Sequence, residues 1–428
     1  MPTPDAPARS ATSRPHTILF APASNVLFHV GRSLTLAREL RRRGHRVAFI
    51  GSPRYLRDPD IAAGEEFEFH PAPDFGADEA MEILRTIHKV PSRRLIDRMI
   101  AAELDVLERV RPDLIVSDFR PTIFIAGRAR GIPLASMLLS HWMQPYSSSP
   151  PRAIRSHAIT ELAARLLGDD LAGRLTPPIW RAVLRYKSRP FRAAERAHGQ
   201  VPRRLVFDTM DGDLNLLTDS EAWSPTRPLP PHFHRVGPIA WEPDLPLPPA
   251  LADLDPERPV VYVTFGSTGH PALFRTIFAC FADTPLQVVV STGGQIDPRD
   301  FDVPSNFIVE RFLPNGKVMQ IADLVIYHGG SGTAYHTVRG AVPAIVVATH
   351  WDQEYAGLVT QEQGLGLGLT MREILRSPRR LLDAVEQVLA NLPAHRDRVE
   401  RLRKDLFKYD GPAAAAGHLE AFLRSRKA

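Results

Sequence analysis

Short apolar runs alternate with amphipathic stretches through the first third of the chain. Four of the apolar runs predict strands: 17–22 (TILFAP), 46–51 (RVAFIG), 112–119 (PDLIVSDF) and 132–139 (IPLASMLL). Helical periodicity lies between them, at 30–45 (VGRSLTLARELRRRGH, ending at Gly44) and 122–130 (TIFIAGRAR). Near-continuous apolar strands that alternate with helices are typical of a parallel sheet covered on both faces. The pattern therefore predicts a doubly wound α/β domain.

A proline-rich stretch at residues 224–259 interrupts this pattern, because neither a helix nor a strand can run far through it. The pattern then restarts, with apolar runs at 260–267, 286–292, 306–312, 323–328 and 344–349 and a helix at 272–281. We expect two Rossmann-like domains whose parallel sheets face each other across a cleft. The expected segments are a disordered N-terminus (1–15), an N-terminal domain (16–237), a linker (238–258), a C-terminal domain (259–410) and a last helix (411–428).

Length and composition agree with this organisation. A chain of 428 residues is too long for one ordinary core, and 44% hydrophobic with 24% charged residues is typical of a globular protein. The chain has no apolar run long enough to span a membrane, and its start lacks the apolar core of a signal peptide, so we expect a cytoplasmic protein. The single cysteine, Cys280, lies in an apolar helical pattern that predicts a buried, unreactive thiol.

The net charge of +5 is concentrated in one segment. Residues 151–200 hold ten Lys and Arg against four Asp and Glu. The segment has no glycine- or aromatic-rich nucleic-acid motif, so we expect no nucleic-acid partner and interpret it as a solvated helix face. Contact of these basic helices with a membrane surface remains an alternative.

A histidine and a glycine-rich turn follow the apolar run at 323–328, and the next run leads to Asp352 and Gln353. In open parallel sheets ligands bind at the carboxyl ends of the strands, where helix N-termini converge. The backbone N–H groups of a glycine-rich turn suit an anion such as phosphate, and His328, Ser331 and Thr333 add donors. The turn lacks the lysine of an ATPase P-loop and the spacing of a dehydrogenase fingerprint.

Residues 311–353 combine these features in an order that resembles a known family. The order is Pro314, His328-Gly-Gly-x-Gly-Thr, Gly340-x-x-Pro343 and Asp352-Gln353. It is similar to the donor-binding signature of the UDP-glycosyltransferase-like family, which comprises the GT-B fold enzymes of glycosyltransferase family 1, in its bacterial natural-product and antibiotic branch. Weaker similarity covers nearly the whole chain, including "RELRRRGHRVAF" near the start, "RVGPI" before the linker and "VTFGS" after it.

The resemblance implies that the C-terminal domain binds a nucleotide-diphosphate sugar. It implies that Phe312 lies by the base, that Asp352 and Gln353 bind sugar hydroxyls, and that the diphosphate is held by Ser267, His328, Gly330, Ser331, Gly332 and Thr333. These residue types suit those roles, because a carboxylate and an amide can accept from and donate to adjacent hydroxyls while imidazole and backbone N–H groups suit phosphate oxygens.

The resemblance also points to a catalytic histidine. Members usually carry a Gly-His pair after the first strand, and His29 lies eight residues before Ala37, as the family spacing requires. Phe28 stands in place of the glycine, and Arg32 stands where a proline is common. A histidine whose second nitrogen faces a carboxylate suits a general base, and Asp118 matches the family's partner carboxylate.

His336 is the main departure in the donor half. Relatives usually place a ribose-binding glutamate eight residues after the motif histidine, and a neutral imidazole offers only one acceptor nitrogen. We therefore expect a weaker ribose contact and regard a dTDP-sugar as equal to a UDP-sugar as donor.

The acceptor is less defined. The family's variable acceptor segment corresponds to residues 141–200, where we expect Trp142, Met143 and Tyr146 to contact an apolar acceptor. We expect no metal and no cofactor, since no metal-ligand spacing is present. The predicted function is an inverting, metal-independent glycosyltransferase acting on a small natural-product acceptor. Three alternatives stay open: a lipid-linked sugar transferase at a membrane surface, a nucleotide-sugar epimerase, and a catalytically silent partner protein. A homodimer is also left open.

Overall fold

The computed structural model describes residues 14–58, 61, 66–143, 147, 154–266 and 270–426. Within them the strands form two sheets. The first sheet contains β1 (Thr17–Pro22), β2 (Arg46–Gly51), β3 (Glu68–Pro71), β4 (Leu114–Asp118), β5 (Leu134–Leu138), β6 (Leu214–Leu217) and β7 (Phe233–Arg235). The second contains β8 (Val260–Thr264), β9 (Gln287–Ser291), β10 (Phe307–Glu310), β11 (Leu324–Tyr327), β12 (Ala344–Ala348) and β13 (Gly366–Thr370).

Both sheets have the strand order of a doubly wound fold. The first runs β3-β2-β1-β4-β5-β6-β7 and the second β10-β9-β8-β11-β12-β13, with parallel strand pairs throughout. The order reverses between β1 and β4 in the first sheet and between β8 and β11 in the second. In this topology ligands bind beyond the carboxyl ends of the strands at the reversal point, which is where the candidate residues of both domains lie.

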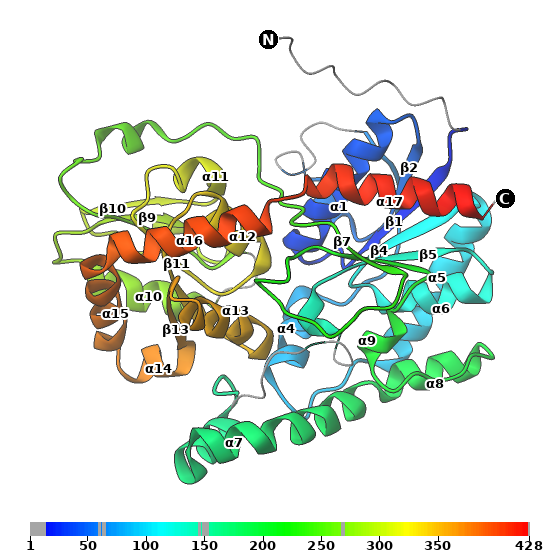
Figure 1. Cartoon of the computed structure of the whole chain (residues 1–428), viewed down its shortest axis with the longest axis horizontal. Coiled ribbons are helices and arrows are strands. Elements are labelled where there is room, and N and C mark those ends of the chain that lie inside the picture. The colour runs from blue at the N-terminus through cyan, green and yellow to red at the C-terminus, as the bar shows by residue number, and fades with distance from the viewer. Residues whose placement is uncertain are drawn as a thin grey trace.

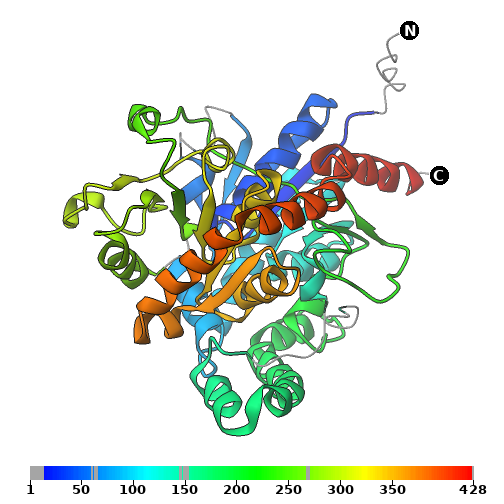
Figure 2. The same ribbon diagram turned by 60° about the vertical axis from the view of Figure 1, so that its left-hand side comes forward.

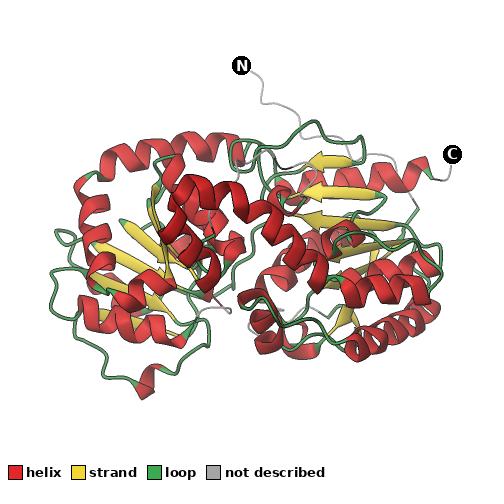
Figure 3. Cartoon of the chain, turned by 90° about the horizontal axis from the view of Figure 1, so that it is seen from below, coloured by secondary structure: helices red, strands yellow, loops and turns green. Residues whose placement is uncertain are grey.

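Helices cover both faces of each sheet, and Figure 3 shows each sheet as a layer between them. The N-terminal helices are α1 (Leu27–Arg42), α2 (Pro53–Leu56), α4 (Ala77–Arg85), α5 (Arg93–Val110), α6 (Pro121–Ala129), α7 (Ala158–Lys187), α8 (Arg189–Ala197) and α9 (Val206–Thr209). The helices that follow β8 in the chain are α10 (Pro271–Phe281), α11 (Asn315–Val318), α12 (Ser331–Arg339), α13 (Trp351–Glu362), α14 (Met371–Arg376), α15 (Arg379–Ala390), α16 (Leu392–Leu406) and α17 (Gly411–Ser425). The predicted α/β fold with two parallel-sheet domains is confirmed.

The last helix returns to the N-terminal domain, as Figure 1 shows for α16 and α17. Ala415 and Leu419 of α17 are buried in the same apolar cluster as Val30 and Leu34 of α1. Arg43 adds an ion pair with Glu420 at 3.1 Å. The C-terminus therefore ties the two domains together on one side of the molecule.

Helix α7 ties them together on another side. Its first turn carries Glu161, which accepts from Arg372 at 2.8 Å and from Arg376 at 2.9 Å, both on α14 of the C-terminal domain. Gly168 interrupts the helix with a φ of 77°, so its two halves run in different directions, and Figure 2 shows this turn at the lower edge of the molecule. No helix in the described ranges has both the length and the apolar character needed to cross a lipid bilayer.

Candidate active site

A cavity of about 340 Å³ opens between the two domains. Its lining includes Phe28 and His29 of the N-terminal domain, and His328, Gly330 and Asp352 of the C-terminal domain. All of them follow the carboxyl end of a strand or begin the next helix, because both sheets point this edge toward the other domain. The volume lies in the range of small-molecule sites.

His29 and Asp118 meet at the reversal point of the first sheet. His29 lies in the first turn of α1, directly after β1, and Asp118 is the last residue of β4, which pairs with β1 in register at Pro22. The Nδ1 atom of His29 lies 2.6 Å from Oδ1 of Asp118. The predicted pair is therefore brought together by strands that are almost 90 residues apart in the sequence.

Arg32 contacts the same carboxylate. It lies one turn after His29 on α1 and donates from Nε to Oδ2 and from Nη2 to Oδ1 of Asp118, and its Nη1 donates to the Thr218 hydroxyl at 2.9 Å. Its guanidinium also lies over the Phe28 ring, 4.4 Å from the centroid. Phe28 and Arg32, which both depart from the family pattern, thus pack on each other, and Arg32 holds Asp118 in place.

The charge of Asp118 is kept in spite of its burial. Burial raises the pKa of this carboxyl, but the charges and hydrogen bonds of Arg32 and His29 outweigh it and hold the pKa below its usual value. An ionised carboxylate only accepts hydrogen bonds, so His29 carries its proton on Nδ1 and leaves Nε2 as an acceptor. His29 lines the cavity, and this arrangement can take a proton from a hydroxyl bound there.

The glycine-rich turn lies opposite His29. Helix α12 starts at Ser331 with Gly330 as its N-cap, and among the described residues no side chain caps its first turn. Gly329 has a φ of 93°, and a Cβ atom there would lie 2.5 Å from the backbone oxygen of Gln353. Gly329 thus allows the turn to lie against the first turn of α13, and the uncapped start of α12 lines the cavity.

His328 is a buried neutral imidazole. Burial, with the nearby His350, lowers the pKa of His328 to about 3, and its Nδ1 atom has no hydrogen-bond partner in the described part of the chain. Gly330 lies against this ring, since a Cβ atom at Gly330 would be 2.4 Å from Nε2. The ring is thus held in place beside the first turn of α12.

Asp352 is bound from the other domain. His141 donates to its Oδ1 atom at 2.8 Å and Trp142 donates at 2.6 Å, both from the segment that follows β5. Burial raises the pKa of Asp352, but these hydrogen bonds and the histidine charges lower it overall to about 2. Its neighbour Gln353 accepts from Thr349 N at 2.9 Å, and its side chain lines the cavity.

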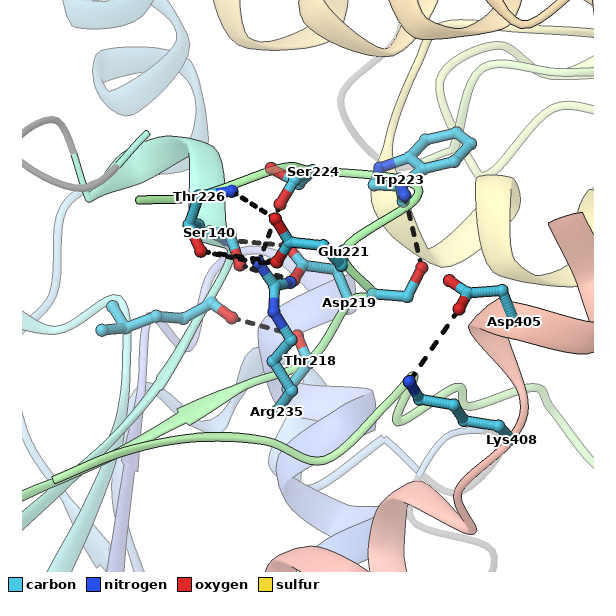
Figure 4. Close-up of polar contacts among 12 residues, drawn as sticks. Ser140, Thr218, Asp219, Glu221, Trp223, Ser224, Thr226, Arg235, Asp405 and Lys408 are labelled. Atoms are coloured by element: carbon cyan, nitrogen blue, oxygen red, sulfur yellow. Dashed lines mark hydrogen bonds and ion pairs between the residues drawn. The ribbon is translucent and has the colours of Figure 1, made fainter. Parts of the chain in front are cut away.

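A polar cluster shown in Figure 4 supports the loop that carries His141 and Trp142. Asp219 accepts from Ser140 N at 2.7 Å and from the Ser140 hydroxyl at 2.6 Å, and Arg235 contacts the same carboxylate at 2.9 Å. Because Ser140 directly precedes His141, this cluster fixes the position of the two donors to Asp352.

The N-terminal side of the cavity is mostly apolar. Its side chains come from the loop before α4 and from α4, α5, α7, α8 and α9, and include Phe75, Met81, Met99, Trp180, Phe191 and Phe207. Lys187 also lies at this wall, but its Nζ atom donates to the backbone oxygens of Ile83, Thr86 and Lys89 at 2.6, 2.6 and 2.8 Å. The amine therefore secures the end of α4.

Several expected residues lie elsewhere. Met143 is buried in the core cluster and is not part of the cavity lining, whereas Trp142 lines it. His336 is absent from the lining as well: its Nε2 donates to the Trp241 backbone oxygen at 3.1 Å, and its ring is buried against Glu242. The expected contacts of Ser267 and Tyr146 fall outside the described residues. Cys280 is half-buried rather than buried, and its Sγ lies 3.6 Å from the Pro378 oxygen.

The remaining donor residues line the cavity together. They are Phe312, His328, Gly330, Ser331, Gly332, Thr333, Asp352 and Gln353. Sequence analysis assigned no role to His141 and did not predict the contact between Arg32 and Asp118. The position of His141, directly after a strand next to β4, is the one signal that could have identified it.

A family model matches a segment in the C-terminal part of the chain. Residues 276–422 match the model described as erythromycin biosynthesis protein CIII-like, C-terminal domain. A PGL/p-HBAD biosynthesis rhamnosyltransferase of Mycobacterium bovis is 29% identical over 394 residues, covering 91% of this chain and 84% of the relative. The NDP-glycosyltransferase YjiC of Bacillus subtilis is 25% identical over 403 residues, covering 92% and 95%.

Solved structures show the same two-domain architecture. The calicheamicin glycosyltransferase CalG4 superposes with a TM-score of 0.65 at 24% identity, covering 96% of this chain and 99% of that one. The glycosyltransferase VinC in complex with dTDP superposes with a TM-score of 0.66 at 19% identity, covering 96% and 100%. These likenesses confirm the expected GT-B arrangement of the two domains.

Proposed function

We propose that this chain, a glycosyltransferase of the GT-B fold, moves a sugar from a nucleoside diphosphate to a hydroxyl of an apolar acceptor, with inversion at the anomeric carbon. The general activity rests on relatives named glycosyltransferases that align with nearly the whole chain. The observation that carries the finer proposal is the His29 and Asp118 pair, which faces the uncapped start of α12 across one cavity.

The transfer step follows from the chemistry of that pair. The acceptor oxygen forms a bond to the anomeric carbon while its proton passes to Nε2 of His29, and Asp118 stabilises the imidazolium that forms. The bond from the anomeric carbon to the diphosphate oxygen breaks at the same time, and the diphosphate leaves with the bonding electrons. Direct displacement by a base-activated hydroxyl inverts the configuration of the sugar.

The leaving diphosphate needs positive potential and donors. The first N–H groups of α12 and the hydroxyls of Ser331 and Thr333 supply them at the cavity wall, and His328 adds a neutral ring beside them. We therefore propose a transfer that uses neither a metal ion nor a cofactor. Initial rates should be the same with and without excess EDTA; a loss that magnesium or manganese restores would contradict this part.

The acceptor side is proposed from the apolar wall. Aromatic and methionine side chains dominate it, and Trp142 and Trp180 lie there with Phe119, which stacks on His29 with ring centroids 5.4 Å apart. A flat apolar acceptor with one reactive hydroxyl fits such a wall, because burial of apolar area supplies the binding free energy and His29 selects the hydroxyl.

The experiment uses the purified chain in two steps. Thermal shift with UDP-, dTDP- and GDP-sugars identifies the donor, and incubation of that donor with phenolic acceptors is followed by mass spectrometry. The expected result is an acceptor whose mass rises by one sugar residue, with free nucleoside diphosphate released. An altered sugar nucleotide without acceptor would indicate an epimerase, and no turnover of any bound donor would overturn the proposal.

A further inference from the structure

The solvent-facing side of α7 is unusually apolar. Seven of the thirteen exposed large apolar side chains in the described ranges lie on this helix, and they are 40–75% exposed: Leu162, Leu166, Leu167, Leu171, Leu175, Ile179 and Tyr186. Single exposed leucines are common on protein surfaces, but seven such side chains on one 30-residue segment are not. We call this group the α7 apolar stripe.

The stripe follows the helix geometry. Leu171, Leu175 and Ile179 recur every four residues, so they lie on one side of the second half of α7. Ala172, Thr176, Trp180 and Leu184 recur in the same way and form the buried side. Stripe and buried side are separate, and Figure 1 shows α7 along the lower edge of the molecule with no other labelled element beyond it.

A row of arginines borders the stripe. Arg174, Arg181 and Arg185 are exposed, and they lie seven and four residues apart, next to Leu171 and Leu175 on the helix surface. No ion pair joins any of the three to a described acidic residue, in contrast to Arg165, which contacts Glu161 at 2.7 Å. The exposed face of α7 is therefore apolar in the middle and cationic at one border.

We propose that this face of α7 docks on the surface of a lipid bilayer that contains anionic headgroups. Leucines beside arginines on one exposed helix face are the pattern of helices that lie in the membrane interface, where the apolar side chains enter the acyl boundary and the cations contact headgroups. The local excess of positive charge over residues 151–200 acts in the same direction.

A second copy of the chain fits this face less well. A twofold contact would bring two identical surfaces together, each with the three arginines of the row and, of the described acidic residues, only Asp170 one turn before Arg174. Like charges in a dry interface would oppose association, whereas an anionic bilayer supplies the missing counter-charge.

Docking would bring the acceptor side of the cavity close to the lipid. Trp180 and Leu184, on the buried side of α7, line the cavity, so the two sides are separated by about one helix diameter, roughly 10 Å. This consequence rests on the proposed function, but the docking itself does not, because the stripe lies outside the cavity.

The test is co-sedimentation of the full chain with vesicles. We expect binding to vesicles of phosphatidylcholine and phosphatidylglycerol in equal parts, and at least about tenfold weaker binding to phosphatidylcholine alone. The variant Leu171→Glu/Leu175→Glu/Ile179→Glu should lose binding. Replacing Arg174, Arg181 and Arg185 by Gln should weaken binding to the anionic vesicles at least about tenfold and hardly change it for neutral ones.

The matched control is Val201→Glu/Leu375→Glu/Tyr409→Glu, which makes the same change in charge at exposed apolar positions outside α7. It should bind like the wild type. Loss of binding in the control, equal binding to both vesicle types, or no vesicle binding by the wild type would overturn the proposal. A dimer in light scattering that the α7 variant dissociates would overturn it in favour of a second copy. Turnover without vesicles is measured in parallel, so a failure of docking is distinguished from a failure of the transfer activity.

Discussion

Arg32 holds the carboxylate of Asp118 through two of its nitrogen atoms, and both side chains are fully buried. The same carboxylate accepts a hydrogen bond from His29, so Asp118 contacts both the guanidinium of Arg32 and the proposed base. Removing either partner of a buried ion pair leaves the other uncompensated, which links the stability of this domain to its chemistry.

His29→Ala should lower kcat by roughly 10² to 10⁴ and leave nucleotide affinity unchanged, because the imidazole acts on the acceptor proton and not on the donor. Steady-state kinetics and calorimetric titration of UDP and dTDP measure the two quantities. His88→Ala, at an exposed histidine, is the matched control and should behave like the wild type. Near-normal turnover of a folded His29→Ala protein would exclude His29 as the base.

Arg32→Met should destabilise the protein by about 3–5 kcal/mol, because Asp118 loses its main counter-charge in a dry site. The turnover number kcat should also fall, because Asp118 is no longer held in the position that orients His29. Urea unfolding and steady-state kinetics are the measurements.

The double variant Arg32→Met/Asp118→Asn separates the effect on stability from the effect on turnover. It should recover part of the stability, because no unpaired carboxylate remains, but kcat should stay low because His29 has lost its anion. Full recovery of kcat would show that the carboxylate is only structural.

Gly330→Ala should weaken the binding of UDP and dTDP by about tenfold or more, roughly 1.4 kcal/mol. The added Cβ would lie 2.4 Å from Nε2 of His328, so the ring or the first turn of α12 must move. Calorimetry with both nucleotides measures this. Gly417→Ala on α17 meets no atom within 4 Å and should leave affinity unchanged; unchanged affinity of Gly330→Ala as well would remove the turn from the binding site.

His336→Glu tests where the ribose contact lies. In the structure His336 donates to the Trp241 oxygen and lies near Glu242, so a carboxylate there loses a hydrogen bond and faces a second anion. We expect a loss of stability of about 1–3 kcal/mol and an unchanged ratio of UDP to dTDP affinity. A preferential gain for UDP in calorimetric titration would instead restore the ribose role of this position.

Stability should fall as the pH drops below about 6.5. Burial lowers the pKa of His350 to about 4 and that of His328 to about 3, so the folded chain keeps both rings neutral while the unfolded chain takes up protons. The loss runs from pH 6.5 down to about 4 for His350 and to about 3 for His328, and is on the order of 2 kcal/mol for each ring at pH 5. Urea unfolding at several pH values measures it. His350→Gln should flatten the slope and His88→Gln should not; equal slopes in all three proteins would contradict the assignment.

The fold class and the place of the glycine-rich turn at a strand end could be predicted from the sequence. Alternating apolar strands and helices are local patterns, and the turn from His328 to Thr333 is contiguous, so its geometry follows from glycines and a helix start that the sequence displays. The resemblance to the family implied the pair of His29 and Asp118, and the two side chains meet because β1 and β4 are adjacent parallel strands.

The partners of these residues could not be predicted from local patterns, because they depend on the tertiary structure. The contact of Arg32 with Asp118 spans 86 positions and that of Trp142 with Asp352 spans 210, and such contacts depend on sheet order and domain closure. The orientation of His336 toward Trp241, and of α7 with its leucines in solvent, likewise depends on which face of a helix meets the core. Periodicity reports that a helix has a face, but it does not say which neighbour, if any, covers it.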